Sequence, residues 1–298
     1  GGPLPMRRHV RILPLLLGVV LLLPAAPRPG LSALSTCPAH FVAGDDPAIV
    51  KPRLAQDTRE ICYSGYAVLH SGITRTPLWS AEHLTRDRVA DAEAMTRENA
   101  FHPEPSLPPA ERAELKDYQR SGFDRGHMAP SGDMPDPQSQ QESFSLANMV
   151  PQNRENNRGL WAHIEMAVRR LAERDGDLYV VTGPVFRGET LQRLNGRVLV
   201  PTMLYKAVYD PARRQAGAYL VRNESGDEYE TVSLAQLKDL TGIDVFPALP
   251  PEVKAAAMPL PPPVDERQRR RGRPTAGGGG RGGAEGSGAE GSSAPSQR

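Results

Sequence analysis

The chain has little of three features that often classify a protein: cysteine, net charge and long apolar segments. Its 298 residues include two cysteines and carry a formal net charge of +1. The longest apolar run, residues 12–23, is shorter than the roughly 20 residues that a membrane-spanning helix needs. With only two cysteines, separated by a long stretch of chain, a zinc site is not expected. The balanced charge by itself identifies no partner.

The N-terminus has the pattern of a secretory signal peptide. Gly1 to Pro5 precede Met6 and are set aside as residues added by cloning. Three arginines within residues 7–11 come before the apolar run, and small residues follow it, with Ala33-Leu34-Ser35 as one cleavage site. Residues 6–35 are therefore predicted to be a signal peptide, with a retained anchor as the alternative. The mature protein is expected to be periplasmic or extracellular and free of the membrane.

Export would place both cysteines in an oxidising compartment. An even number of cysteines there favours one disulfide, Cys37–Cys62, and two free thiols are the alternative. Cys37 lies well past the apolar run and follows Thr36, so attachment of a lipid is not expected.

The composition divides the rest of the chain into two parts. Residues 36–250 are long enough for one domain with a proper core. Residues 251–298 form a tail that is Pro-rich at first and then rich in Arg, Gly and Ser, and the part after about Leu260 is predicted to be disordered. The arginines of residues 267–273 would add sequence-independent affinity for a polyanion, or would form a solvated tail without a role.

Strand and helix patterns alternate along the domain. β-Branched and aromatic residues predict strands at 61–69, 77–84, 178–185, 197–208 and 216–221, with a hairpin near Ser71-Gly72. Helices are predicted at 108–118, 156–174 and 234–240, and a loop with a helical turn at 85–102. The mixture and the hairpin-like spacing predict an α+β domain, with a central, mainly antiparallel sheet flanked by helices.

The most informative motif is Asp124-Arg125-Gly126-His127. Gly126 allows a tight turn beside His127, and a neutral histidine near pH 7 can accept a proton from an attacking water. A lone histidine is more often structural, but this one has charged neighbours. Asp124 and Arg125 either pair to orient the loop or leave Arg125 free to contact phosphate.

An asparagine-rich segment begins about thirty residues after this motif. The carboxamide of Asn157 is a candidate ligand for a hard divalent cation, because Mg²⁺ keeps several waters and needs few protein ligands. Asn157 also suits the first turn of a helix, and the two roles are compatible. Asn153 and Asn156 are rivals that spacing alone does not exclude.

Four further residues are candidates for the same site. Glu165 and Arg169 are four residues apart on the predicted helix, so they form either a surface ion pair or a group that holds metal-bound water and phosphate. Asn148 lies in an apolar stretch and either holds the loop backbone or touches substrate. Arg97 is a weaker candidate for a phosphate contact.

Taken with this spacing, the chain resembles the DNA/RNA non-specific endonuclease family, the ββα-metal nucleases. The match runs through 124–130, Asn148 with Pro151-Gln152, 157–161 with Glu165, and Thr182-Gly183-Pro184. The resemblance implies a ββα-metal motif and cleavage of DNA and RNA to 5′-phosphate ends, with Mg²⁺ (or Mn²⁺) as cofactor.

The resemblance also implies a role for each candidate residue. His127 would be the general base, Asn157 the direct metal ligand, and Glu165 the residue that holds the metal's waters. Arg169 would stabilise the scissile phosphate. The remaining residues would bind substrate phosphate or shape the site: Arg125, Arg97, Asp124 and Asn148.

Two other functions compete with this hypothesis. One is a nucleic-acid-binding protein with weak or no catalysis on the same scaffold, which would bind tightly in EDTA without turnover. The other is a metal phosphodiesterase that acts on a small nucleotide. The sequence leaves the oligomeric state and the preference between DNA and RNA open.

Overall fold

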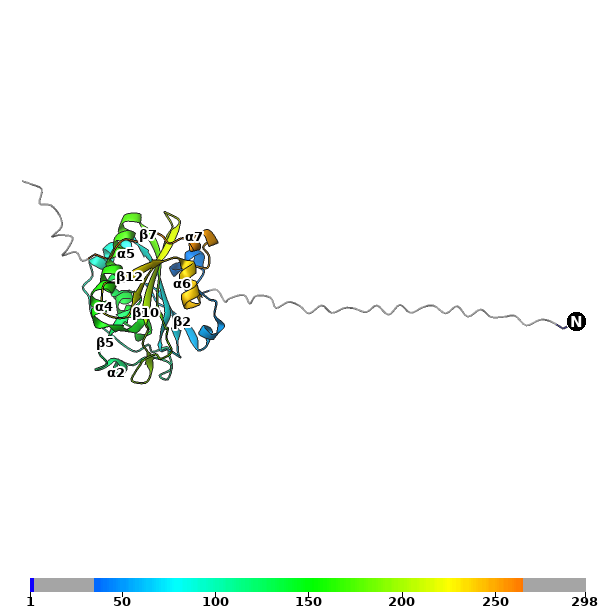
Figure 1. Cartoon of the computed structure of the whole chain (residues 1–298), viewed down its shortest axis with the longest axis horizontal. Helices are drawn as coiled ribbons and strands as arrows, with labels where there is room; N and C mark the ends of the chain where they lie inside the picture. Colours follow the sequence, from blue (N-terminus) through cyan, green and yellow to red (C-terminus); the bar gives the residue numbers. More distant parts are fainter. Residues whose placement is uncertain (3–34, 265–298) are drawn as a thin grey trace, which may run out of the picture. The chain divides into compact units, whose positions relative to one another are not determined.

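The computed structural model describes residues 1–2 and 35–264, and residues 35–264 contain the folded domain (Figure 1). The predicted signal peptide, apart from Ser35, and the arginine- and glycine-rich end of the tail lie outside the described residues. Within the described part, no helix has the length and apolarity needed to cross a membrane.

The centre of the domain is a seven-stranded sheet in which every neighbouring pair is antiparallel. From edge to edge its strands are β12 (Tyr229–Val232), β11 (Gln215–Arg222), β10 (Met203–Asp210), β7 (Asp177–Val185), β4 (Thr76–Thr85), β3 (Ala67–Ser71) and β2 (Thr58–Cys62). The predicted α+β class with a central antiparallel sheet is confirmed.

Helices and short strands surround this sheet. The helices are α1 (Arg86–Glu93), α2 (Leu115–Tyr118), α3 (Pro137–Ser143), α4 (Arg154–Arg158), α5 (Leu160–Asp175), α6 (Leu234–Thr241) and α7 (Pro251–Ala255). The other strands pair as β1 (Ala48–Ile49) with β13 (Ile243–Asp244), β5 (Phe123–His127) with β6 (Met149–Asn153), and β8 (Arg193–Leu194) with β9 (Val198–Leu199). Figure 1 shows α4 and α5 on one side of the sheet and α6 and α7 on the other.

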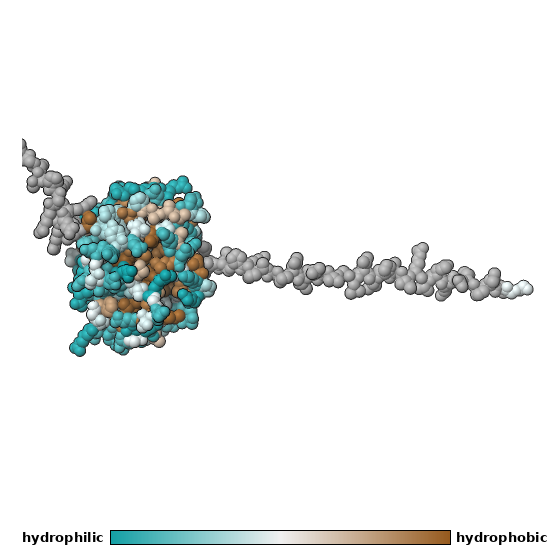
Figure 2. Space-filling model, viewed as in Figure 1, coloured by the Kyte–Doolittle hydropathy of each residue, from teal (hydrophilic) through white to brown (hydrophobic). Residues whose placement is uncertain are grey.

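Side chains alternate between the two faces of the sheet, as the period of a strand requires. On β7, Val180 packs in the cluster under α5, whereas the next residue, Val181, packs in the cluster under α6. We call the α5 side the cleft face and the α6 side the far face. The surface seen in Figure 2 is mainly hydrophilic, and Val50, Ile73 and Tyr229 are the large apolar residues exposed within the described part.

Two predicted elements are split in the structure by glycine. The predicted strand 61–69 is the hairpin β2–β3, whose turn contains Gly65, where a Cβ would lie 2.6 Å from the Met134 sulfur. The predicted helix 156–174 is two helices, α4 and α5, separated at Gly159 (φ −111°, ψ −107°). A Cβ at Gly159 would lie 2.8 Å from the Glu155 carbonyl oxygen, so this break requires glycine.

Other boundaries differ because tertiary contacts override local patterns. The predicted strand 197–208 is interrupted between β9 and β10, and only 115–118 of the predicted helix 108–118 is helical. The predicted loop at 85–102 begins with a full helix, α1, which Thr85 caps by accepting a hydrogen bond from the Arg88 backbone amide. The predicted helix at 234–240 is confirmed, with Ser233 as its N-cap and Gly242 in the left-handed conformation after it.

The folded chain continues past the expected domain end at residue 250. Helix α7 covers part of the far face, and Met258 is 3% exposed. The Met258 backbone amide donates to the Ala216 carbonyl of β11 at 2.8 Å. The first part of the Pro-rich segment therefore packs on the domain.

The expected Cys37–Cys62 disulfide is not present, and the structure has two free thiols. Cys37 is buried just before the 3₁₀ turn η1 (Pro38–His40), and Cys62 is exposed at the end of β2. The two thiols lie within hydrogen-bonding reach of each other. Burial raises the pKa of Cys37 well above its usual value, so its thiol stays protonated and is a poor nucleophile for disulfide exchange.

Candidate active site

A small ββα unit carries the DRGH motif on the cleft face. Strands β5 and β6 pair antiparallel, with His127 opposite Met149, and the chain then enters α4. Gly126 is required here because a Cβ would lie 2.0 Å from Gln152 Oε1. The Gln152 amide donates in turn to Asn156 Oδ1 at 2.8 Å, which ties β6 to the first turn of α4.

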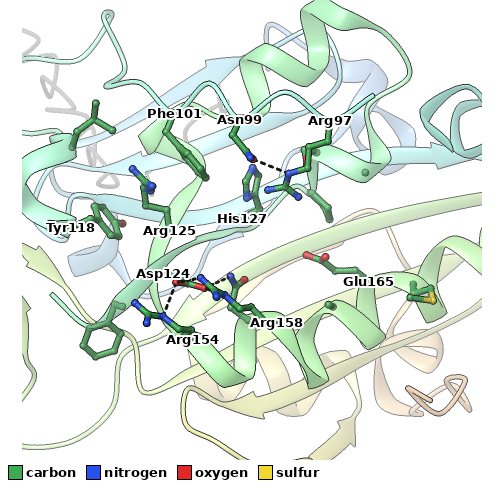
Figure 3. A pocket seen from close by; sticks show the side chains of 18 of the residues that line it. Arg97, Asn99, Phe101, Tyr118, Asp124, Arg125, His127, Arg154, Arg158 and Glu165 are labelled. Atoms are coloured by element: carbon green, nitrogen blue, oxygen red, sulfur yellow. Dashed lines mark hydrogen bonds and ion pairs between the residues drawn. The ribbon is translucent and has the colours of Figure 1, made fainter. Parts of the chain in front are cut away.

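A cleft of about 1130 Å³ opens where β5, α4 and α5 meet. Asn157, the predicted metal ligand, lines it. Six of the seven residues predicted to act in catalysis or to bind substrate also line it: His127, Arg125, Arg97, Asp124, Glu165 and Arg169. Asn148 is the predicted residue that does not line it. Figure 3 shows His127 between Arg97 and Arg125, with Glu165 reaching toward the same space from α5.

His127 lies at the end of β5 in an aromatic pocket. The residue is 8% exposed, and the rings of Phe144 and Phe101 lie 4.9 and 5.6 Å from its ring centre. Burial, with the nearby charges of Arg97 and Arg125, lowers the pKa of His127 to about 3. The imidazole is therefore neutral at physiological pH, as a base must be.

The two ring nitrogens of His127 have different surroundings. Nε2 is buried and has no hydrogen-bond partner among the described residues. Nδ1 is not among the buried atoms that lack a partner, and His127 lines the cleft. Nδ1 is therefore the nitrogen that water can reach. A free, neutral nitrogen facing a cleft is suited to accept a proton from water.

The structure separates Asn157 from its two rivals. Asn153 caps α4 through Oδ1, and Asn156 is buried, accepting from Gln152 and donating to the Arg222 carbonyl. Asn157 lines the cleft, and its Nδ2 donates to Asp124 Oδ2 at 3.1 Å. With its amide nitrogen held by Asp124, the Asn157 carbonyl oxygen is left for another partner.

The donor set fits a hydrated Mg²⁺ better than a metal caged by protein. Among the described residues, no three His, Cys, Asp or Glu side chains are grouped to hold a metal ion. A carboxamide oxygen and a nearby carboxylate are hard oxygen donors, and Mg²⁺ usually keeps several waters beside one or two such groups. Asn157 and Glu165 supply these groups in one cleft.

Asp124 has a different place from the one expected. It does not pair with Arg125, and its two oxygens accept hydrogen bonds from Arg158 at 2.8 Å, Arg154 and Asn157. Burial alone would raise the pKa of Asp124, but the bonds from Arg158 and Asn157 outweigh it and lower that pKa. A carboxylate occupied in this way does not bind an anionic substrate. Asp124 instead orients the Asn157 amide.

Arg125 and Arg97 stand on aromatic rings beside His127. The Arg125 guanidinium lies 4.1 Å from the Phe101 ring centre, and the Arg97 guanidinium lies 5.3 Å from that of Phe144. Within the described part, neither arginine forms an ion pair, and Arg97 donates to Asn99 Oδ1 at 2.9 Å (Figure 3). Stacking holds the planar groups while leaving their N–H donors for phosphate.

Glu165 and Arg169 do not form the simple pair that their spacing suggests. Arg169 Nη1 donates to Asp133 Oδ1 at 2.8 Å. Burial tends to lower the pKa of Arg169, but the negative charges of Asp133 and Glu165 have the larger combined effect and raise that pKa. Burial raises the pKa of Glu165, and the positive charges of Lys206 and Arg169 partly offset that rise.

Asn148 is a framework residue, and the expectation that it binds substrate is not met. It is fully buried, and its Oδ1 accepts from the Ser80 hydroxyl and the Ala129 amide. Its Nδ2 donates to the carbonyls of Ala129 and Ser143. All of its hydrogen-bonding positions are used. Asn148 holds the chain just after His127, which is the backbone role that the sequence left open.

Sequence reasoning missed several residues of the site. Phe101 and Phe144 form the walls around His127, and Asp133 and Lys206 lie behind the cleft. Nothing in their local sequence marks them, because each comes from a different part of the chain. Arg154 and Arg158 had a visible signal, since they flank the asparagine cluster and lie one turn apart.

The cleft is positively charged. Five arginines line it, against two carboxylates, Asp124 and Glu165. Such a surface attracts a polyanion by long-range electrostatics.

Comparison with known proteins gives relatives that share this part of the chain. The family model described as DNA/RNA non-specific endonuclease matches residues 45–252. The mitochondrial nuclease EXOG of Danio rerio is 38% identical over 208 residues, which covers 63% of this chain and 60% of that protein. Nuclease C1 of Cunninghamella echinulata var. echinulata is 34% identical over 218 residues, 66% of this chain and 86% of that protein. The chain thus spans about six tenths of the length of the EXOG nucleases that it matches.

A solved structure supports the same relationship. The crystal structure of the EndoG/EndoGI complex, which describes the mechanism of EndoG inhibition, contains a chain that matches with a TM-score of 0.54 and 28% identity. The match covers 62% of this chain and 84% of that one. The family model covers well over half of the sequence, including the whole cleft. The chain therefore belongs to the DNA/RNA non-specific endonuclease family.

Proposed function

We propose that this chain is an exported, metal-dependent nuclease that hydrolyses phosphodiester bonds of DNA and RNA and leaves 5′-phosphate ends. One observation carries the proposal: the free nitrogen of His127 and the Asn157 carboxamide line the same positively charged cleft. Mg²⁺, or Mn²⁺, held by Asn157 with its waters bound by Glu165, would stabilise the charge that develops on the phosphate oxygens.

The residues of the chain perform the remaining steps. His127 accepts the proton of the attacking water at Nδ1, while the Phe101 and Phe144 rings limit access of bulk solvent to the imidazole. Arg169, Arg125 and Arg97 bind phosphate oxygens and place the phosphorus for in-line attack.

Low base specificity follows from the chemistry of the cleft. Arginine side chains dominate its polar lining, and contacts to phosphate carry no direct sequence information. The same contacts exist in DNA and RNA, so both polymers are expected to be substrates.

The decisive experiment is the substitution His127→Ala. Loss of a general base is expected to lower the rate of cleavage of both plasmid DNA and RNA by about 1000-fold. His83→Ala is the control, because His83 lies outside the cleft, where it contacts Asp177 and stacks on Tyr179. Circular dichroism checks that both variants fold.

Two results would contradict the proposal. Full cleavage activity in His127→Ala would remove His127 as the base. Tight binding of nucleic acid in EDTA, with no turnover when Mg²⁺ or Mn²⁺ is restored, would support the alternative of a binding protein. Cleavage of dinucleotides but not of polymers would support the small-substrate alternative.

Export is a separate part of the proposal. It is supported by the arginines, the apolar run and the small residues of positions 6–35. The mitochondrial location in the names of some relatives describes those proteins and does not locate this chain. N-terminal sequencing of protein recovered from the periplasm or the medium is expected to begin near Ser35. Full-length protein retained inside the cell would overturn it.

A further inference from the structure

Two buried carboxyl groups lie behind the cleft without lining it. Glu82, on β4, is 1% exposed, and Asp133, in the 3₁₀ turn η4 (Ser131–Asp133), is 3% exposed. Buried carboxyl groups are costly unless they are bonded, so each needs a physical reason. Asp133 bonds to Arg169 of the cleft, and Glu82 bonds to Arg88, which does not line the cleft.

Asp133 contacts the cleft residue directly. Its Oδ1 accepts from Arg169 Nη1 at 2.8 Å, and the Asp133 side chain is 4% exposed. The preceding residue, Gly132, also lies close, because a Cβ there would be 3.3 Å from the same Nη1 atom. The turn η4 therefore holds the guanidinium both by charge and by close packing.

Glu82 is connected to Asp133 from the opposite side. Arg88 Nη2 donates to Glu82 Oε2 at 3.1 Å, and Arg88 Nε donates to the Asp133 backbone carbonyl at 2.7 Å. The other oxygen, Oε1, is buried and has no hydrogen-bond partner among the described residues. Arg88 thus joins the Glu82 side chain to the backbone of η4.

The protonation of Glu82 completes the connection. Burial and the negative charge of Asp133 raise the pKa of Glu82 to about 8. Near pH 7 the Glu82 carboxyl is neutral, and its proton can be donated to Asp133, whose carboxyl group is within side-chain hydrogen-bonding reach of Glu82. The Asp133 Oδ1 atom still accepts from Arg169 Nη1.

We propose that Asp133 is a positioning residue that orients the Arg169 guanidinium for phosphate, and that Glu82, held by Arg88, fixes Asp133 in turn. This inference rests on the proposed nuclease function, because it assigns Arg169 its phosphate. A guanidinium held at one end presents its remaining N–H groups in a fixed direction, so less entropy is lost when it binds the transition state.

The first test is Asp133→Asn, which keeps the shape of the side chain but removes its charge. We expect kcat for plasmid cleavage to fall about tenfold, with a smaller change in KM, because the contact acts mainly in the transition state. Asp210→Asn is the matched control, since Asp210 is a buried aspartate paired with Arg213 and lies outside the cleft. It is expected to leave kcat unchanged.

A double-mutant cycle with Arg169→Ala separates positioning from a structural effect. If Asp133 acts through Arg169, Asp133→Asn lowers kcat no further in the Arg169→Ala background. The same tenfold loss in both backgrounds would overturn the proposal, and so would unchanged kcat in the single variant. Thermal melting of all four proteins shows whether folding contributes.

Glu82 is tested with two replacements of similar length. Glu82→Gln retains a donor toward Asp133 and is expected to keep kcat within about twofold, whereas Glu82→Met loses the donor and is expected to lower kcat about fivefold. Equal kcat values for the two variants would refute the role of Glu82.

The same cycle is measured on binding of a short single-stranded oligonucleotide in EDTA. Lack of metal-dependent cleavage by the unmutated protein would refute the nuclease function but would leave the coupling between Asp133 and Arg169 measurable. Cleavage with additive effects of the two substitutions would refute only the positioning role.

Discussion

The two faces of the seven-stranded sheet are built from the same strands but carry different chemistry. On the far face, Trp79, Val181 and Tyr205 pack in a continuous apolar cluster. On the cleft face, Glu82 and Lys206 are buried among apolar residues of the neighbouring cluster. The alternation of side chains along each strand lets one sheet provide a stable core on one side and a charged support for the cleft on the other.

The cleft face tolerates buried charge because each charge has partners. Lys206 Nζ donates to the Thr182 hydroxyl at 2.7 Å and to the Met128 carbonyl at 3.5 Å, directly after His127. Its ammonium group also lies 5.6 Å from the Trp161 ring centre. Glu82 and Lys206 thus lie buried on the face that supports the cleft, whereas the apolar far face supplies stability.

The largest expected effect comes from placing a charge on the far face. Val181→Lys puts an ammonium group between Ala81 and Ala207, the paired residues on the neighbouring strands, inside the apolar cluster of the far face. We expect a loss of more than about 4 kcal/mol in the free energy of unfolding. Chemical denaturation measures it, and Val181→Met, of similar length, should cost about 1–3 kcal/mol. Similar losses for the two variants would show that the far face does not discriminate against charge.

The next prediction compares two neighbouring asparagines on the cleft side. Asn157→Ala should lower the rate of cleavage about 100-fold and raise the Mg²⁺ concentration needed for half-maximal rate, with little change in melting temperature. Asn156→Ala should instead cost about 1–3 kcal/mol of stability, because it leaves the Gln152 amide without its buried acceptor. A metal titration and a denaturation curve for each variant check this. If Asn156→Ala rather than Asn157→Ala alters the Mg²⁺ requirement, Asn156 and not Asn157 is the metal ligand.

A third prediction concerns a pH dependence of stability that comes from Glu82. An unfolded glutamate titrates near pH 4.3, at about its reference pKa, whereas burial raises the folded-state pKa of Glu82 to about 8. The folded protein binds this proton more tightly, so its stabilising contribution is complete below the unfolded pKa and is lost as the pH rises through 8.

Glu82→Gln removes this titration. Its melting temperature relative to the unmutated protein should therefore rise between pH 5 and pH 9. Glu111→Gln serves as control, because Glu111 is a partly exposed residue in a surface pair with Arg59. Parallel curves for Glu82→Gln and the unmutated protein would contradict the prediction.

Local patterns predicted much of the fold and most of the cleft. The predicted strands 178–185 and 77–84 are central strands of the sheet, and the stripe from Trp161 to Leu171 is the buried side of α5. His127, Asn157 and Glu165 lie in one cleft, as their motif implied. Periodicity failed where one glycine changed the path of the chain, as at Gly65 and Gly159, because a break in direction leaves the composition of the segment unchanged.

The roles of individual polar residues were harder to predict, because they depend on partners that are distant in sequence. Asn148 has its hydrogen bonds satisfied by Ser80, Ala129 and Ser143, so it serves as framework. Asp124 is occupied by residues of α4 and does not face substrate. Cys37 and Cys62 are neighbours as expected but are free thiols.

The order of residues along the chain was enough to determine the α+β class, the histidine and the carboxamide of the cleft, and the family, because each depends on short patterns of side-chain type. Tertiary structure decided which asparagine faces the cleft, which carboxyl groups lie behind it, and which arginines remain available to phosphate. Those outcomes depend on burial and on hydrogen-bond partners brought together from β4, η4, α5 and β10, and only the folded chain places those elements side by side.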